Sequence, residues 1–310
     1  MNNSAHRRRP HLLYPGSPDI TSGPARGVAL LSLPATALAG ALVFTLSGGD
    51  GTSTPATGAH QPNSASATLN RIAVAAKAID ETPVKHGQYV YVESLTRSDE
   101  GTFNGPVYLG ALHRRQVWMA QDPAAVTWTG WIRETGKGTP MPRELIPVAS
   151  SSPVPAGIDR PTYRWLASLP TDPDKLLTLL YSRTRVFEGE SEEQAVFSKI
   201  GELVGETIMP PANTAAFYRA AAKIPGVREI PDAVDAAGRH GIAGTREDAS
   251  SATRDEWIFD KDSLAFLGSR SYMTNGAGKE AGSVTLFGTS AIMRRTVVDQ
   301  HGEAPAKTDG

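Results

Sequence analysis

Serines beside glycine are the first candidates for covalent chemistry, because a serine hydrolase needs an exposed nucleophile on a sharp turn. The usual pentapeptide, G-x-S-x-G, does not occur in the sequence. Gly268-Ser269-Arg270 and Gly288-Thr289-Ser290 lie within strand-like patterns, so we interpret them as structural. In the glycine-rich segment Asn275–Gly282, Gly278-Lys279 is followed by Glu280, where a phosphate-binding loop requires serine or threonine. We therefore predict no catalytic residue and no enzyme activity.

Metal-binding side chains are equally scattered. His86, His113 and His240 stand alone, without the H-x-H or H-E-x-x-H spacing that brings two imidazoles to one ion. Asp260-Lys261-Asp262 contains two carboxylates, but it lacks the central glycine and the closing glutamate of a calcium loop. Because aspartate and serine in such positions bond to their own backbone, we interpret Asp260–Ser263 as a hairpin turn. We predict no metal and no cofactor.

A group of aromatic residues is a stronger indication of binding. Tyr89, Tyr91, Trp118, Trp128 and Trp131 all fall in one β-rich part of the sequence. Strand alternation predicts that Trp128 and Trp131 lie on opposite faces of the sheet, so that one packs in the core while the other lines a groove. We name these five as candidate residues for binding an apolar or peptide ligand, the alternative being that they only pack the core.

The hydrophobic pattern predicts an α+β domain with one mainly antiparallel sheet. Apolar residues at helical spacing open the domain at Leu69–Ile79 and return in a central insert. Alternating patterns on both sides of the insert predict strands joined by short hairpin links. The predicted strands are Gly87–Leu95, Val107–Leu112, Arg115–Ala120, Val126–Arg133, Trp257–Phe259, Leu264–Phe266, Ser283–Phe287 and Ala291–Asp299.

The central insert carries recognisable helix starts. Thr171 precedes Asp172-Pro173-Asp174, which predicts a helix with Thr171 as its N-cap. Ser191-Glu192-Glu193-Gln194 has the form of a capping box, and a third helix is predicted near Asn213–Lys223. Behind the capping box, apolar side chains at helical spacing predict one buried face, formed by Val196, Phe197, Ile200, Leu203 and Val204.

An uncharged apolar stretch stands near the N-terminus. Residues 27–49 carry no charge. As a helix they would be roughly 35 Å long, enough for the roughly 30 Å hydrocarbon core of a bilayer. Residues 1–26 mix Arg, Pro, Gly and Ser without apolar periodicity, which predicts a disordered tail. The arginines in it predict that this tail is cytoplasmic and that the chain after the helix faces outward. Ala37-Leu38-Ala39 also has the form of a signal-peptidase site, so cleavage after Ala39 is the alternative.

One domain is expected beyond the anchor. Residues 50–68 are rich in Gly, Ser, Thr and Pro and predict a flexible linker, residues 69–300 form the α+β domain, and residues 301–310 form a disordered tail. The formal net charge of −1 provides no basic field, so we predict no nucleic-acid partner. The sequence contains no cysteine, so the domain is stabilised without disulfides.

Several blocks of the sequence stand in an order that resembles a known family. They are YRWLASLPTDPDKLLTLLY, FSKIGELVGETIMPP, AAFYRAAAKIPGV, DAVDAAGRHGIA and EWIFDKDSLAFLGSRS. Over roughly residues 69–300 they resemble an actinobacterial family of single-pass membrane proteins of unknown function, often encoded beside extracytoplasmic-function sigma factors. This resemblance implies an N-terminal anchor and an outward α+β domain, and it supplies no catalytic residue. More weakly, the alternation of sheet and helices resembles the curved half-barrel of periplasmic lipoprotein carriers and envelope-stress regulators.

These observations predict a membrane-anchored extracytoplasmic binding or sensing domain in the plasma membrane, with its N-terminus in the cytoplasm. The resemblance connects it with sigma-factor signalling and a protein partner, although residues 1–26 are too short for a sigma-binding domain and lack the cysteines of a zinc-type module. The alternative is a carrier or reservoir for an apolar ligand such as a lipid, recognisable by an apolar inner sheet face left unfilled. An envelope hydrolase, less favoured, would need Ser, His and a carboxylate within hydrogen-bond reach.

Overall fold

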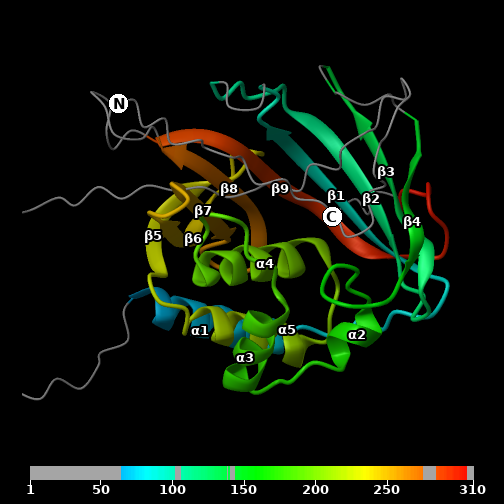
Figure 1. Ribbon diagram of the computed structural model, residues 1–310, viewed down its shortest axis with the longest axis horizontal. Helices are drawn as coiled ribbons and strands as arrows, with labels where there is room; N and C mark the ends of the chain where they lie inside the picture. The colour runs from blue at the N-terminus through cyan, green and yellow to red at the C-terminus, as the bar shows by residue number, and fades with distance from the viewer. Residues whose placement is uncertain (1–63, 102–105, 138, 140–143, 275–283, 306–310) are drawn as a thin grey trace, which may run out of the picture.

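The computed structural model describes residues 64–101, 106–137, 139, 144–274 and 284–305. They form one nine-stranded antiparallel sheet in the order β4-β3-β2-β1-β9-β8-β7-β6-β5. The sheet is curved and does not close, so β4 and β5 are its two edges (Figure 1). Its strands are β1 Tyr89–Ser98, β2 His113–Ala120, β3 Val126–Thr135, β4 Ile146–Val154, β5 Arg228–Val234, β6 His240–Asp248, β7 Thr253–Phe259, β8 Phe266–Thr274 and β9 Val284–Val298.

Helices lie together on one side of this sheet, which we call the inner face (Figure 1). Helix α1 contacts β5 and β6, and α4 contacts β6 and β8. Apart from α1, all the described helices fall between β4 and β5 in the sequence, which confirms the predicted helical insert. The helices are α1 Ser64–Lys77, α2 Tyr163–Ala167, α3 Pro173–Arg183, α4 Glu192–Glu206 and α5 Pro211–Ala221.

The main core lies between the helices and the β7 region of the sheet. Helix α1 contributes Leu69 and Ile72, and β7 contributes Trp257 and Phe259. The α4 face predicted from the sequence is buried as expected, since Val196, Phe197, Ile200, Leu203 and Val204 are each at most 3% exposed. The α+β class and the mainly antiparallel sheet are thus confirmed.

Helix starts are close to prediction but differ in their capping residues. Asp172, and not Thr171, caps α3, because its side chain accepts from the backbone N–H of Lys175 and Pro173 occupies the first helical position. Ser191 caps α4 as predicted, accepting from the N–H of Gln194. The Gln194 side chain, however, bonds to Asp255 and Arg246 instead of completing the capping box.

The strand predictions fail in two ways, and the missed strands pair with neighbours that are near in sequence. Residues 107–112 contribute only an isolated bridge between Leu109 and Asp99, and they form no strand. Strands β4, β5 and β6 were not predicted; β4 reads IPVASSSPV, in which Ser and Pro hide the strand pattern. Because β4 and β5 are the edges of the sheet, their outward residues need not be apolar.

The predicted transmembrane helix lies outside the described residues and stays a prediction. Among the described helices, none is long and apolar enough to cross a membrane. Residues 1–26 and most of the predicted linker also lie outside the described part of the chain. At the other end, residues 299–305 run along the sheet, where Glu303 and Gly302 accept hydrogen bonds from Trp118 and Arg133.

Candidate ligand-binding site

Helix α4 turns a polar face toward the sheet. Ser198, Gly201, Glu202, Gly205 and Glu206 recur at i, i+3, i+4, i+7 and i+8, and all five line a cavity between α4 and the inner face. The opposite side of the same helix is the buried apolar face. Small and polar side chains on the side of α4 that faces the sheet thus line the space between them.

Two contacts hold α4 in its position over the sheet. Gly201 passes so close to the Trp257 indole that a Cβ there would lie 2.4 Å from Nε1. At the C-terminal end, the Arg295 guanidinium of β9 donates to the carbonyl groups of Val204, Gly205 and Thr207. Orphan carbonyls at a helix end are thereby satisfied from the sheet, and the position of α4 over the cavity is set.

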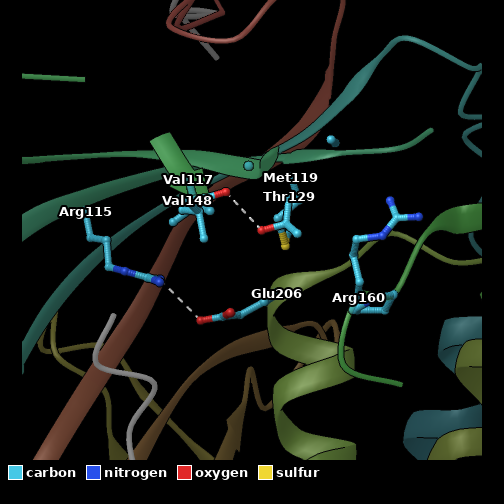
Figure 2. A pocket seen from close by; sticks show the side chains of 10 residues that line it. Arg115, Val117, Met119, Thr129, Val148, Arg160 and Glu206 are labelled. Atoms are coloured by element: carbon cyan, nitrogen blue, oxygen red, sulfur yellow. Dashed lines mark hydrogen bonds and ion pairs between the residues drawn. The ribbon is translucent and has the colours of Figure 1, made fainter. Parts of the chain in front are cut away.

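An apolar pocket lies beyond the C-terminal end of α4, against β2, β3 and β4 (Figure 2). Its volume is about 570 Å³, including its open mouth. Val117 and Met119 of β2 and Val148 of β4 form its apolar walls, and Pro161 also lines it. The two valines and Met119 belong to a small cluster around Val117 and Ile132 that is separate from the main core.

Arg160 closes one side of the apolar pocket. Its guanidinium donates to the carbonyl groups of Asp122 and Ala124 at 2.9 and 2.7 Å, and the residue is 3% exposed. Burial lowers the pKa of this guanidinium. It therefore acts as a structural clamp that ties the segment before α2 to the turn between β2 and β3.

A polar cavity adjoins the apolar pocket and extends beneath α4 to β7. Its volume is about 810 Å³, including open space. Adjacent strands place Trp257, Ser269, Ser290 and Thr96 in one row across β7, β8, β9 and β1. The Ser269 and Ser290 hydroxyls lie 2.9 Å apart and bond to each other. The row gives the cavity a floor of hydroxyl groups.

Asp255 is the most deeply buried acid of the polar cavity. Its carboxylate accepts from the Ser198 and Ser271 hydroxyls, each at 2.8 Å, and from the Gln194 amide at 3.0 Å. Burial raises its pKa to about 6 even though these three donors favour the charged form. Gln194 is oriented in turn by Arg246, so the network joins α4 to β6, β7 and β8.

Arg115 and Glu206 line both spaces, and we call their position the junction. Figure 2 shows the two side chains pointing toward each other on one side of the apolar pocket. The Arg115 guanidinium lies 3.2 Å from the Glu206 carboxylate and 3.9 Å from that of Glu134. Glu134 also lies 3.4 Å from His113 and raises the pKa of that imidazole. The junction thus carries one cation shared between two carboxylates.

The five aromatic residues named from the sequence lie on the other, outer face of the sheet. Tyr91 and Trp118 are fully buried in ring contact, and Trp118 donates to the Glu303 carbonyl. His301 stacks on Trp131 at 4.0 Å and meets the edge of Tyr89 at 5.5 Å. The structure therefore brings Tyr89, Tyr91, Trp118 and Trp131 together under the C-terminal segment. Their role in ligand binding stays a prediction.

The prediction that Trp128 and Trp131 lie on opposite faces is wrong. Their rings touch edge to face at 5.8 Å. The register of β3 against β4 shifts between Val126 and Trp128 and again between Trp128 and Gly130, and such a bulge turns the side chain to the other face. Trp128 is 59% exposed, the most open of these aromatic side chains.

The remaining candidates from the sequence are the Asp260 turn and the serines beside glycine. The Asp260 carboxylate accepts from the N–H and hydroxyl groups of Ser263 at 2.7 and 2.8 Å, which confirms the hairpin-turn interpretation. Ser269 and Ser290 lie within β8 and β9, in keeping with the strand-like patterns, and they also line the polar cavity. Among the described residues that line the two spaces, none is a histidine, so the trio that a hydrolase needs does not form there.

Sequence reasoning missed the residues of both spaces. Val117, Val148 and Arg115 look like ordinary strand residues, and Glu206 like an ordinary helix residue. The one available signal was the polar stripe of α4, because Ser198, Glu202 and Glu206 recur at helical spacing opposite an apolar face. On a helix inserted between strands, that pattern can indicate a lined cavity as well as a solvent-facing surface.

No protein-family model and no curated protein matches the sequence. Two solved structures show a weak likeness. A LolA-superfamily protein from Nitrosomonas europaea is 11% identical over 74% of this chain and 91% of that chain, with a TM-score of 0.20. A domain described as an outer membrane lipoprotein-sorting protein, from Vibrio parahaemolyticus, is 9% identical over 77% and 95%, with a TM-score of 0.19. No match supports the resemblance to the sigma-factor-linked family.

Proposed function

We propose that the domain binds an apolar or amphipathic small molecule, such as a lipid, and serves as its carrier or reservoir. The observation that carries the proposal is the apolar pocket on the inner face of β2, β3 and β4, which the helices leave unfilled.

The walls of the pocket supply the driving force. Met119 and Val148 are only partly buried and pack beside the buried Val117, so a bound chain would remove their remaining apolar surface from water. Each buried methylene of a ligand contributes about 0.8 kcal/mol. An alkyl chain is thus the group that gains most from this space.

We further propose that residues 27–49 anchor the protein in the plasma membrane with the domain outside the cell. The pocket would then lie near the outer surface of the plasma membrane, whose lipids are a source of apolar ligands. Sensing of the ligand through a protein partner, linked to sigma-factor signalling, is the second role that the sequence predicts. Cross-linking in intact cells, followed by purification from membranes, tests it, and recovery of this protein alone would contradict the sensing role.

The binding proposal predicts that a charge placed in the pocket weakens binding. Val148→Glu puts a carboxylate on the apolar wall, where bringing an alkyl chain against it carries a desolvation cost. We expect its Kd for a fluorescent long-chain alkyl probe to rise at least about tenfold, since one unfavourable contact of about 1.4 kcal/mol has that effect. Fluorescence titration of the full chain measures it.

A matched control is the same substitution at an exposed valine. Val74, on α1, is 63% exposed and does not line either space, so Val74→Glu should leave probe affinity unchanged. Far-ultraviolet circular dichroism of both variants shows that each is folded. Equal affinities for wild type and Val148→Glu, or no saturable binding to wild type, would contradict the proposed function.

A further inference from the structure

The polar cavity and the apolar pocket are neighbours that share two lining residues. Arg115 and Glu206 stand at the junction, with Val117 and Val148 on one side and Ser269 and Ser290 on the other. A molecule that crosses this junction would meet apolar walls at one end and hydroxyl groups at the other. That is the pattern expected for one amphipathic ligand.

Charged groups around the polar cavity already have partners. Glu206 pairs with Arg115 at 3.2 Å, and Glu202 pairs with Lys199 at 2.6 Å. Asp255 holds three hydrogen bonds from Ser198, Ser271 and Gln194. The described lining therefore offers an anionic ligand no free cation, while its carboxylates would repel it.

Hydroxyl groups are the side chains best able to bond to a ligand there. Ser269 and Ser290 bond to each other, but a serine hydroxyl carries one donor and two acceptor sites, so both retain capacity. Ser94, on β1, also lines the cavity. Donors and acceptors of this kind match a partner that itself both donates and accepts.

We propose that the ligand is an amphiphile with an uncharged, hydroxyl-rich head group, a sugar or polyol, held in the polar cavity while its chain lies in the apolar pocket. The inference rests on the proposed function and specifies the chemical class of its ligand. The Arg115–Glu206 pair then lies beside the bond that joins head group to chain.

Three probes with one chain and different head groups test the inference. They are decyl glucoside, decyl sulfate and decyltrimethylammonium, each titrated into the full chain below its micelle-forming concentration and followed by calorimetry. We expect decyl glucoside to bind at least about tenfold more tightly than either charged probe. Equal affinities, or tightest binding by a charged probe, would overturn the head-group inference and leave the apolar pocket standing. Failure of all three to bind would instead contradict the proposed function.

Paired serine variants locate the head group. The double variant Ser269→Ala/Ser290→Ala should weaken decyl glucoside about tenfold and leave the two charged probes unchanged. Ser168→Ala/Ser182→Ala removes two exposed helix hydroxyls outside both spaces and should change nothing. If the cavity double variant binds decyl glucoside like the wild type, the polar cavity does not hold the head group.

Discussion

Burial and hydrogen bonding act in opposite directions on the pKa of the Asp255 carboxyl group. Three donors favour its charged form, yet burial raises its pKa from 3.8 to about 6. Glu202, which lines the same cavity, also has a pKa raised by burial. Individual residues around the cavity are therefore tuned by the depth at which the fold places them, which residue type alone does not reveal.

At this scale we predict a pH dependence of stability. Between pH 3.8 and about 6 the folded protein holds a proton on Asp255 that the unfolded chain has released, so the stability contributed by this group falls as pH rises. The shift corresponds to about 3 kcal/mol at pH values above 6. Asp255→Asn should remove this dependence, as measured by urea unfolding from pH 4 to pH 8.

Asp260→Asn is the matched control for that prediction. Hydrogen bonds from Ser263 lower the pKa of the Asp260 carboxyl, so its contribution is present above pH 3.8 and is lost as pH falls further. Over the measured range of pH 4 to pH 8, Asp260→Asn should therefore leave the shape of the pH profile nearly unchanged. A wild-type-like profile for Asp255→Asn would show that Asp255 does not titrate in this range.

The element that shapes the site is α4, whose residues were assigned correctly on one face only. Ser191 and the apolar stripe identify the helix because capping and amphipathic spacing are local signals. In the sequence, its polar face has the pattern of a solvent-exposed surface. That face becomes a cavity wall only because the folded sheet lies opposite it. Strand β3 shows the same limit, since its register shift against β4 moved Trp128 to the outer face.

Two glycines of α4 give opposite predictions. Gly201→Ala would place a methyl 2.4 Å from the buried Trp257 indole, which is itself stacked on Phe197 and cannot move aside. We expect a loss of about 1–3 kcal/mol in the free energy of unfolding, as for other overpacked sites. Gly205→Ala meets Phe266 at 3.4 Å, an ordinary contact, and should gain up to about 1 kcal/mol from helix propensity.

Chemical denaturation of both glycine variants checks this pair. The comparison separates the effect of close packing from that of helix propensity, because the two positions lie on the same face of one helix. If Gly201→Ala were as stable as Gly205→Ala, α4 would not be held at the distance that keeps the cavity open.

At the scale of the whole molecule, the C-terminal segment covers the aromatic cluster of the outer face. His301 stacks on Trp131, Glu303 accepts from the Trp118 indole, and Arg294 donates to the Pro305 carbonyl. Residues 301–310 were predicted to be a disordered tail, and residues 301–305 instead lie against the sheet.

Deleting residues 301–310 should therefore destabilise the fold. We expect a loss of about 1–3 kcal/mol, the cost of leaving the buried Trp118 N–H without a partner, together with stronger acrylamide quenching of tryptophan fluorescence. Deletion of residues 306–310 alone is the control and should change neither quantity. Unchanged quenching in the longer deletion would show that the segment does not protect the outer-face aromatic residues.

The sequence by itself determined the α+β class, the helical insert, the Ser191 cap and the Asp260 turn, because each depends on periodicity or on bonds between near neighbours. Only the tertiary structure decided that Ser269, Ser290 and Ser198 face one cavity with Arg115 and Glu206. Those residues lie on four different strands and helices, β2, β8, β9 and α4, and are brought together by strand pairing across long stretches of chain. Strand register and sheet curvature determine which of these side chains face the same cavity, and neither property can be derived from one segment of the sequence.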